Sequence, residues 1–308
     1  MELSGVKIAV LGGDDRDLVL IPELIKSGMK INLVGFPELP ELAGVNRCES
    51  IDDALLDVQA VLMPMPGTDA SGVVRAVYAK QPLVLHEKHM QQLPPDTPLI
   101  IGVARPFLRE WTARYRLRLT EIAELDHVAI MNSIPSAEGA IQIAMQELPI
   151  TIHGSSSWVL GFGRVGQTLA RMLSALGAHT TVCARKKSDL ARIWEMGYQP
   201  VGFDELEERV GQAEILFNTV PSLVLKENVL KRCSPEVLII DLASQPGGTD
   251  FQVAESLGIK AILAPGLPGK VAPKTAGRIL ARLLPELIYN EINRGKKTSA
   301  ESVESGIV

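Results

Sequence analysis

Aromatic residues and cysteines are scarce in this sequence of 308 residues. Only 4% of the residues are aromatic, which is too few for a surface that stacks on nucleic-acid bases. The three cysteines, Cys48, Cys183 and Cys233, lie far apart and form no CxxC pair. This pattern fits a reducing cytosol and argues against a structural zinc site, so we expect no metal.

An excess of positive charge and long apolar runs are also missing. Lys and Arg total 31 against 36 Asp and Glu, and this formal net charge of -5 gives no reason to expect nucleic acid or an anionic membrane as a partner. No run reaches the roughly 18 apolar residues of a membrane span. The stretch "MELSGVKIAVLGG" leads directly into a strand pattern without a signal peptide, so we expect a cytoplasmic protein.

Short apolar runs alternate with amphipathic stretches along the whole chain. The runs have the length of strands and lack polar alternation, which is typical of parallel strands covered on both faces. They are "VKIAVLG", "INLVGF", "AVLMPM", "LVLH" and "LIIGV" in the first half, and "SSWVLGF", "HTTVCA", "YQPVGF", "EILFNTV", "VLIIDLA" and "KAILAPG" in the second. Helical patterns between several of them complete a βαβ series, which predicts an α/β fold with parallel sheets.

Three helices can be located by steps of three and four between apolar residues. The first follows Pro106, the second covers the stripe from Ile141 to Leu148, and the last begins near Lys274. The first is expected to carry Leu108, Trp111, Tyr115, Leu119 and Ile122 on one face. The polar end "RGKKTSAESVESGIV" predicts a disordered tail.

A Gly-x-Gly-x-x-Gly pattern occupies the turn after the strand "WVLGF", at Gly161, Gly163 and Gly166. The first glycine permits the tight turn, the second lets backbone amides approach a pyrophosphate, and the third lets the helix pack closely on the strand. The start of that helix, with Arg164 and Val165, adds partial positive charge. We therefore expect a dinucleotide to bind here. The alternative is a degenerate Rossmann domain that keeps the glycine turn but binds no dinucleotide.

Cationic residues stand at the end of the next strand, where an acidic residue would bind the ribose 2′-hydroxyl of NAD. Arg185, Lys186 and Lys187 are followed by Ser188. A guanidinium can grip the 2′-phosphate of NADP and stack on the adenine. We predict NADP rather than NAD, with Arg185, Lys186 and Ser188 in contact with it; the alternative is a solvated basic turn.

Three further loops follow strands of the second half, and such loops face the ligand crevice of an open parallel sheet. Thr219, Val220 and Pro221 are expected near the adenine-side ribose, and Ala243 and Ser244 near the nicotinamide. Gly266 and Pro268, from "PGLPG", are expected to close the nicotinamide side. Plain turn chemistry is the alternative for the last loop.

The turn after the first strand, "VLGGDDRD", lacks the third glycine. It places Asp14, Asp15 and Asp17 at a helix start, where they suit the helix dipole but would repel a pyrophosphate. We thus predict two Rossmann-like domains with parallel sheets and a cleft between them. The expected parts are a substrate or assembly domain over 1–126, a crossing segment over 127–152, an NADP-binding domain with the C-terminal helix over 153–294, and a tail over 295–308. The alternative for the last helix is that it crosses back to the first domain.

Four segments resemble the dipicolinate synthase A-subunit family: "VAIMNSIPSAEGAIQIAMQ", "TIHGSSSWVLGFGRVGQTLARML", "LIIDLASQPGGTDF" and "APGLPGKVAPKTAGRIL". The likeness covers nearly the whole chain up to about residue 293. It implies a role in spore-forming bacteria, in which the family member works with a smaller, flavoprotein-like B subunit. Together they would convert a dihydrodipicolinate-pathway intermediate to pyridine-2,6-dicarboxylate, with the pyridine-nucleotide site in this family rather than in its partner.

A dicarboxylate substrate calls for cationic or amide partners. Lys270 and Lys274 flank "PGLPG" and a helix start, while Asn132 and Glu138 lie in the crossing segment; these four are the candidate catalytic residues. Ser133, Arg16 and Arg105 are further candidates, and any of the five histidines could accept the proton. Each of these residues also has an ordinary surface, capping or structural explanation.

The His, carboxylate and Arg set of 2-hydroxyacid dehydrogenases is not found at corresponding positions. Two other functions stay open: a different NADP-dependent oxidoreductase of hydroxy or keto acids, and a cofactor-binding regulatory partner without catalysis. The oligomeric state is open as well, with a homo-oligomer as one of the alternatives.

Overall fold

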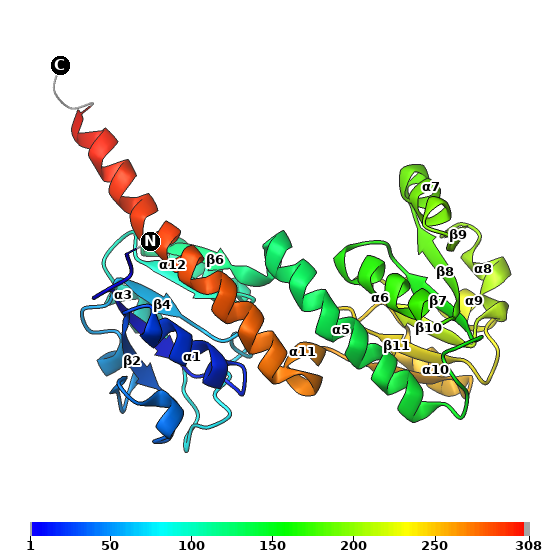
Figure 1. Ribbon diagram of the computed structural model, residues 1–308, viewed down its shortest axis with the longest axis horizontal. Helices are drawn as coiled ribbons and strands as arrows, with labels where there is room; N and C mark the ends of the chain where they lie inside the picture. Colours follow the sequence, from blue (N-terminus) through cyan, green and yellow to red (C-terminus); the bar gives the residue numbers. More distant parts are fainter. Residues whose placement is uncertain (1, 305–308) are drawn as a thin grey trace. The chain divides into compact units, whose positions relative to one another are not determined.

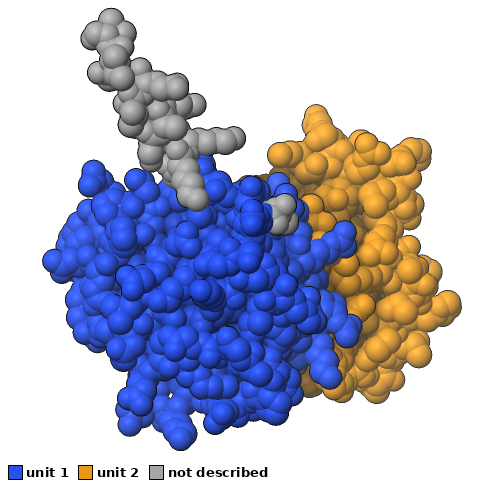
Figure 2. Space-filling model, turned by 60° about the vertical axis from the view of Figure 1, so that its left-hand side comes forward, with its two compact units in different colours: residues 1–129, 273–308 blue, residues 130–272 orange. Residues whose placement is uncertain are grey.

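The computed structural model describes residues 2–304 (Figure 1). By its internal contacts the chain divides into two compact units, residues 1–129 with 273–308, and residues 130–272 (Figure 2). The sequence placed the first boundary at 126 and counted the last helix with the second domain, with a return to the first domain as the alternative; in the structure that helix belongs to unit 1. The predicted cleft between the domains stays a prediction.

Unit 1 is built on a six-stranded parallel sheet. In the order β3-β2-β1-β4-β5-β6, it contains β3 (Asn46–Arg47), β2 (Lys30–Val34), β1 (Lys7–Leu11), β4 (Ala60–Leu62), β5 (Pro98–Ile101) and β6 (Arg118–Glu121). This is the strand order of a Rossmann fold, in which the order reverses between the first and fourth strands. The apolar sequence of β1 is buried on both faces, as expected for a central strand between helical layers.

The helices of unit 1 come from both ends of the chain. They are α1 (Asp17–Lys26), α2 (Ile51–Ala54), α3 (Glu87–Gln91), α4 (Pro106–Arg114) and α12 (Pro273–Glu304), with short 3-10 turns at Pro40–Leu42 and Ile122–Glu124. Figure 1 shows α12 lying along α1. At Gly277 the two helices approach so closely that a Cβ atom would lie 2.6 Å from the carbonyl oxygen of Arg16. Leu280, Leu284 and Ile288 continue the contact and are buried with the strands of the sheet.

Two predictions for unit 1 are wrong. The run "LVLH" forms no sheet strand; Val84 makes only an isolated bridge with Val73. The helix after Pro106 ends at Arg114, because Arg116 adopts a left-handed conformation with φ of 53° and turns the chain back toward the sheet. Leu119 therefore lies in β6, paired with Leu99 of β5, instead of on the helix.

Unit 2 carries a second six-stranded parallel sheet, and here all six predicted strands are confirmed. In the order β12-β11-β10-β7-β8-β9, it contains β12 (Lys260–Leu263), β11 (Leu238–Asp241), β10 (Ile215–Asn218), β7 (Ser156–Leu160), β8 (His179–Ala184) and β9 (Gln199–Gly202). Counted from β7, this is again the Rossmann order, with its reversal between β7 and β10. The protein is thus α/β with two Rossmann-like parallel sheets.

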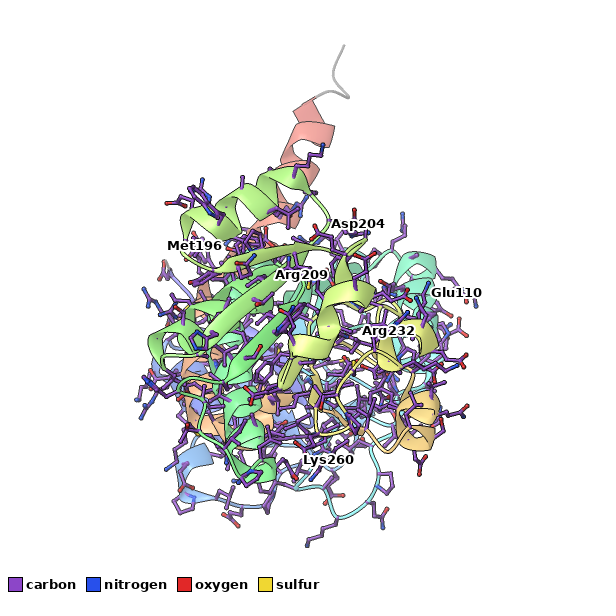
Figure 3. The ribbon with its side chains drawn as sticks, turned by 90° about the vertical axis from the view of Figure 1, so that its right-hand side faces the viewer. Glu110, Met196, Asp204, Arg209, Arg232 and Lys260 are labelled. Carbon is purple, nitrogen blue, oxygen red and sulfur yellow. The ribbon has the colours of Figure 1, made fainter. Side chains whose placement is uncertain are left out.

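The helices of unit 2 cover both faces of this sheet. They are α5 (Asp126–Glu147), α6 (Arg164–Ala175), α7 (Lys187–Glu195), α8 (Leu206–Arg209), α9 (Glu227–Leu230), α10 (Phe251–Ser256) and α11 (Leu267–Val271), with a 3-10 turn at Val210–Gln212. The unit boundary falls inside α5, which makes up most of the predicted crossing segment. The far end of α5 is tied to the sheet by an ion pair from Glu147 to Lys260, the second of which Figure 3 labels.

The end of the chain differs in part from its prediction. The backbone of residues 295–304 continues α12, whereas a disordered tail was expected from 295. Residues 305–308 lie outside the described residues. Among the helices of residues 2–304, none has the length and apolar character needed to cross a membrane.

Candidate cofactor site

The glycine pattern lies in the turn from β7 to α6, and its three glycines have different surroundings. Gly161 has a φ of 102°, which L side chains rarely adopt, and a Cβ atom there would lie 2.5 Å from Oγ1 of Thr219. A Cβ atom on Gly166 would collide with the carbonyl oxygen of Gly161. Apart from Gly163 itself and its two chain neighbours, no described residue has an atom within 4 Å of the Cβ position at Gly163. Two glycines thus bring helix and strand together, and the middle one leaves an open approach to the backbone.

The N-terminus of α6 is open to a ligand in the same place. Gly163 is the N-cap residue, and no described side chain makes a capping hydrogen bond to this helix end. The first turn contains the predicted contacts Arg164, Val165 and Gly166. A 12-residue helix concentrates partial positive charge and N–H donors at this end, which suits a diphosphate.

The loop after β10 meets this turn at the point where the strand order reverses. The backbone N–H and the hydroxyl of Thr219 both donate to the carbonyl oxygen of Leu160, each over 2.9 Å. Asn218, fully buried, accepts a hydrogen bond from the Val220 N–H and donates to its carbonyl oxygen. The structure therefore brings Thr219 and Val220 next to Gly161, with Pro221 following on the exposed side.

A buried carboxylate, Asp241, shapes the neighbouring loop after β11. It accepts hydrogen bonds from the side chain of Asn218 over 2.9 Å and from the backbone N–H of Ala243 over 3.0 Å. It also accepts from the Gly248 N–H over 2.8 Å and the Thr249 hydroxyl over 2.7 Å. The four donors hold both ends of the segment that contains Ala243, which is buried, and Ser244, which is exposed.

Asn218 and Asp241 begin two of the predicted loops, but the sequence analysis gave them no role, although a signal was present. Each is a polar residue directly at the end of an apolar strand, in "ILFN" and "LIID". The carboxyl ends of neighbouring parallel strands meet at one edge of a sheet, so such residues lie close together. Through their hydrogen bonds they position the loops after β10 and β11.

A pocket of about 340 Å³ lies at the end of β8. Its cationic lining residues are Arg185, the first residue after β8, and Lys226, which the sequence interpretation missed. Val220 and Leu223 are apolar lining residues, and so is Phe203, which precedes Asp204 in the segment between β9 and α8; Figure 3 labels Asp204 and also Arg209, the last residue of α8. The pocket thus combines apolar walls with two cations.

The remaining predicted cationic-turn residues follow Arg185 directly. Lys186 is the N-cap residue of α7, and Ser188 lies in its first turn. Lys186 and Ser188 do not line the pocket, in contrast to Arg185. Both remain predicted contacts of the 2′-phosphate.

Three of the four candidate catalytic residues lie on two helices of unit 2 that pack together. Lys270 is exposed on α11, and α11 packs on α5 where Gly139 faces Leu267 and Val271. On α5, Asn132 is half-buried and Glu138 is exposed. Lys274, also exposed, stands on α12 and belongs to unit 1.

The loop that leads into α11 carries the last two predicted cofactor contacts. Gly266 is the N-cap residue of α11 with a left-handed φ of 69°, and Pro268 lies in its first turn. Ser133 of α5, by contrast, is fully buried and bonded to the hydroxyl of Thr168 on α6 over 2.6 Å. It therefore joins two helices and is not available to a substrate.

The corresponding turn in unit 1 is filled by its own carboxylates. The backbone N–H of Asp14 donates to Asp17 over 2.8 Å, and the Arg16 guanidinium forms a 2.6 Å ion pair with Asp14. Burial alone would raise the pKa of Asp14, but the hydrogen bond and charge of Arg16 lower it. Arg16 is thus buried and paired with Asp14, and a phosphate in this turn would meet the negative charge of Asp14.

Comparison with known proteins agrees with the division of the chain into two units, of which unit 2 has the open glycine turn. The sequence is 45% identical over 287 residues to the dipicolinate synthase A subunit of Bacillus subtilis (strain 168), covering 93% of this chain and 97% of that protein. The chain belongs to the dipicolinate synthase A-subunit family. The family model of the A-subunit N-terminal domain matches residues 7–123, and that of the D-isomer specific 2-hydroxyacid dehydrogenase NAD binding domain matches residues 134–245.

Solved structures of this family have the same fold. The dipicolinate synthase A subunit of Bacillus halodurans superposes with a TM-score of 0.90 at 41% identity, covering 94% of this chain and 99% of that one. Its counterpart from Bacillus subtilis gives 0.88 at 45% identity, covering 94% and 97%. D-lactate dehydrogenase of Escherichia coli shares the fold alone, with a TM-score of 0.64 at 13% identity over 94% of this chain and 98% of that one.

The family assignment fits the site. The matched NAD-binding model spans β7, α6, β8 and β10, which carry the glycine turn and the cationic pocket. The second unit of this A-subunit family member is therefore a dehydrogenase-like NAD(P)-binding domain.

Proposed function

We propose that this chain is the NADP-dependent oxidoreductase subunit that forms dipicolinate, pyridine-2,6-dicarboxylate, together with a B subunit. The observation that carries the proposal is the open glycine turn at the strand reversal of unit 2, in a chain 45% identical to a dipicolinate synthase A subunit. The word subunit in that relative's name supports a partner chain. The resemblance to the family supports a role in spore formation.

The diphosphate of the coenzyme would lie over Gly163, against the N–H groups at the start of α6. The adenosine half would occupy the pocket of Arg185, Val220 and Lys226. The nicotinamide half would then lie along the loop that Asp241 holds, and Gly266 and Pro268 would lie on the far side of the nicotinamide. Each step follows the crevice at the carboxyl ends of the strands.

The preference for NADP over NAD rests on charge. No acidic residue stands at the end of β8, where NAD-binding domains place one; Arg185 and Lys186 occupy these positions. Lys226 adds a second cation to the lining of the same pocket. A 2′-phosphate would find charge-assisted hydrogen bonds here, whereas a 2′-hydroxyl would leave the cations without a partner.

The reaction would be the oxidation of a dihydropyridine ring. NADP⁺, when bound, accepts a hydride; the substrate loses that hydride from one ring carbon and a proton from another ring position, and becomes aromatic. If a hydroxylated tetrahydro form enters, water must leave before this step. Lys270, Lys274, Asn132 and Glu138 are the proposed residues for orienting the carboxylates and accepting the proton.

Two measurements test the proposal. NADPH formation is followed by absorbance with the dihydro substrate, using the chain alone and with a B subunit. We expect turnover with NADP⁺. We also expect the wild-type dissociation constants to favour NADP(H) over NAD(H), and the Arg185→Asp substitution to reverse this preference. Tight coenzyme binding without turnover in either mixture would instead indicate a regulatory role, and a wild-type preference for NAD(H) would contradict the cofactor assignment.

The second candidate function is a 2-hydroxyacid dehydrogenase. The family model that matches residues 134–245 favours it, but the His, carboxylate and Arg set of those enzymes is not recognised in this sequence. The same assay with a panel of 2-hydroxy acids in place of the dihydro substrate separates the two. Alanine variants of the four proposed catalytic residues then show whether the site is correctly placed, since at least one must lower turnover.

A further inference from the structure

Unit 1 contains a pocket of about 530 Å³, formed by the segment from Pro66 to Leu83 and by Arg105 at the start of α4. This volume lies within the range of pockets for small organic ligands. The segment follows β4 and is not used in the cofactor site of unit 2. The pocket lies near the strand reversal between β1 and β4, and Rossmann-like sheets bind ligands at such reversals.

Three hydrogen bonds hold the pocket segment in place, one of them from the turn after β1 and one from a side chain. The Gly13 N–H, after β1, donates to the carbonyl oxygen of Arg75 over 2.8 Å, and the Arg75 N–H donates to that of Gly67 over 3.0 Å. The Nε of Arg105 donates to the carbonyl oxygen of Thr68, also over 3.0 Å. These bonds fix the wall of the pocket at three positions, and among residues 2–304 neither terminal nitrogen of Arg105 makes a hydrogen bond.

Positive charge dominates the lining. Arg75, Lys80 and Arg105 are cationic, and Asp69 is the one lining carboxylate, which gives a formal charge of three minus one, or +2. The Asp69 carboxylate already accepts hydrogen bonds from the Ser71 hydroxyl and from two backbone N–H groups, so it stabilises its own turn. None of the three cations has a salt bridge among the residues that the structure describes, although the charge of Arg75 is near enough to Asp14 to help lower the pKa of that carboxyl.

The wall also contains a polar atom without a partner. The hydroxyl oxygen of Thr68 is buried and has no hydrogen-bond partner in the described part of the chain. Buried hydroxyl groups are nearly always hydrogen-bonded in native proteins. An unpartnered hydroxyl next to Arg105 fits a wall that is completed when a polar ligand is bound.

We propose that this pocket is a further dicarboxylate site, in addition to the four proposed catalytic residues, and that it binds a small dicarboxylate through Arg75, Lys80 and Arg105. A ligand with two carboxylates brings a charge of -2, which matches the lining, and guanidinium groups bind carboxylates through two parallel hydrogen bonds. The diphosphate of a coenzyme would not suit unit 1, because the carboxylates of Asp14 and Asp17 fill the turn after β1. The inference rests on the proposed function for the identity of the ligand, a pyridine dicarboxylate.

Calorimetric titration of the full chain with dipicolinate, without coenzyme, tests the pocket. Wild-type protein should bind, and Arg105→Ala and Lys80→Glu should each weaken binding by about tenfold or more. Arg47→Ala is the matched control, because Arg47 is an exposed arginine of the same unit on β3 and does not line this pocket. Lys80 is exposed, so the Lys80→Glu variant should fold normally even if the Arg105→Ala variant does not.

Competition defines the ligand class. Picolinate, with a single carboxylate, and inorganic phosphate should displace dipicolinate only at much higher concentration. Absence of wild-type binding, equal affinity in the Lys80→Glu variant, or equal competition by phosphate would each overturn the inference. Because no coenzyme or turnover is involved, the proposed hydride transfer can fail while this binding succeeds, and the reverse also holds.

Discussion

At the scale of single residues, the two Rossmann-like units differ in what fills the turn after their first strand. In unit 2 that turn has an open middle glycine and an uncapped helix. In unit 1 it is occupied by Asp14 and Asp17, whose carboxylates accept the hydrogen bonds that an anion would take. We therefore expect a few side chains to determine which of the two units holds a diphosphate, although both sheets have the same strand order.

The glycines of unit 2 can be separated by function. Gly166→Ala should destabilise the fold by roughly 1–3 kcal/mol, because the new methyl group overlaps the carbonyl oxygen of Gly161 and forces α6 away from β7. Gly163→Ala should leave the free energy of unfolding nearly unchanged but weaken NADP⁺ binding, since its methyl group enters only the open approach. Urea unfolding and coenzyme titration measure the two effects, and equal losses of stability in both variants would contradict this division.

Asp17 should give unit 1 a dependence of stability on pH. Burial raises the pKa of this carboxyl from 3.8 to about 7, while Asp14 and Arg16 stand beside it with opposite charges. The folded state then holds a proton that the unfolded state has lost, so stability should fall as pH rises from about 4 to about 7, by at most about 1.4 kcal/mol per pH unit. Above that range the stability contributed by the proton is gone.

The variant Asp17→Asn checks this assignment, because a neutral amide of the same size cannot titrate. Its unfolding free energy should be flatter than that of the wild type over the same pH range. Denaturant unfolding at a series of pH values gives the comparison. Identical slopes in the two proteins would show that another group causes the dependence.

At the scale of elements, the apolar runs predicted the second sheet completely and the first one only in part. The strands of unit 2 are continuous buried runs bounded by turn residues, so length and hydrophobicity identify them. In β6, the sequence "RLTE" offers only one large apolar residue, and Leu119 also fits the helical spacing from Trp111. Periodicity cannot show that Arg116 turns the chain, because that depends on pairing with β5.

The long helix α12 should be essential for unit 1. Leu284 is 1% exposed and packs among residues of α1 and the sheet, so Leu284→Ala should cost roughly 2–5 kcal/mol of unfolding free energy. Leu287 of the same helix is only partly buried, and Leu287→Ala serves as the control with a clearly smaller loss. Urea unfolding measures both, and similar losses would mean that α12 contributes little specific packing.

At the scale of the whole molecule, the candidate site combines parts that the sequence could locate with parts that it could not. The fingerprint and the cation after β8 are local patterns, readable from spacing. Lys226, Asn218 and Asp241 join the site only because β8, β10 and β11 end at one sheet edge, and Arg75 and Lys80 line a pocket made by an irregular loop. The last helix belongs to unit 1 because its buried face matches α1, which no local pattern reveals.

The two units should respond separately to two ligands. NADP⁺ alone should slow hydrogen exchange in residues 161–168 and 219–226, since a ligand at 100 times its dissociation constant stabilises its binding state by about 2.7 kcal/mol. Dipicolinate alone should slow exchange in residues 66–83 of unit 1, around Arg75 and Lys80. The Lys80→Glu variant should lose the second protection and keep the first. Protection of 66–83 by NADP⁺ alone, or of 161–168 by dipicolinate alone, would contradict the assignment of the coenzyme turn to unit 2 and of this additional dicarboxylate pocket to unit 1.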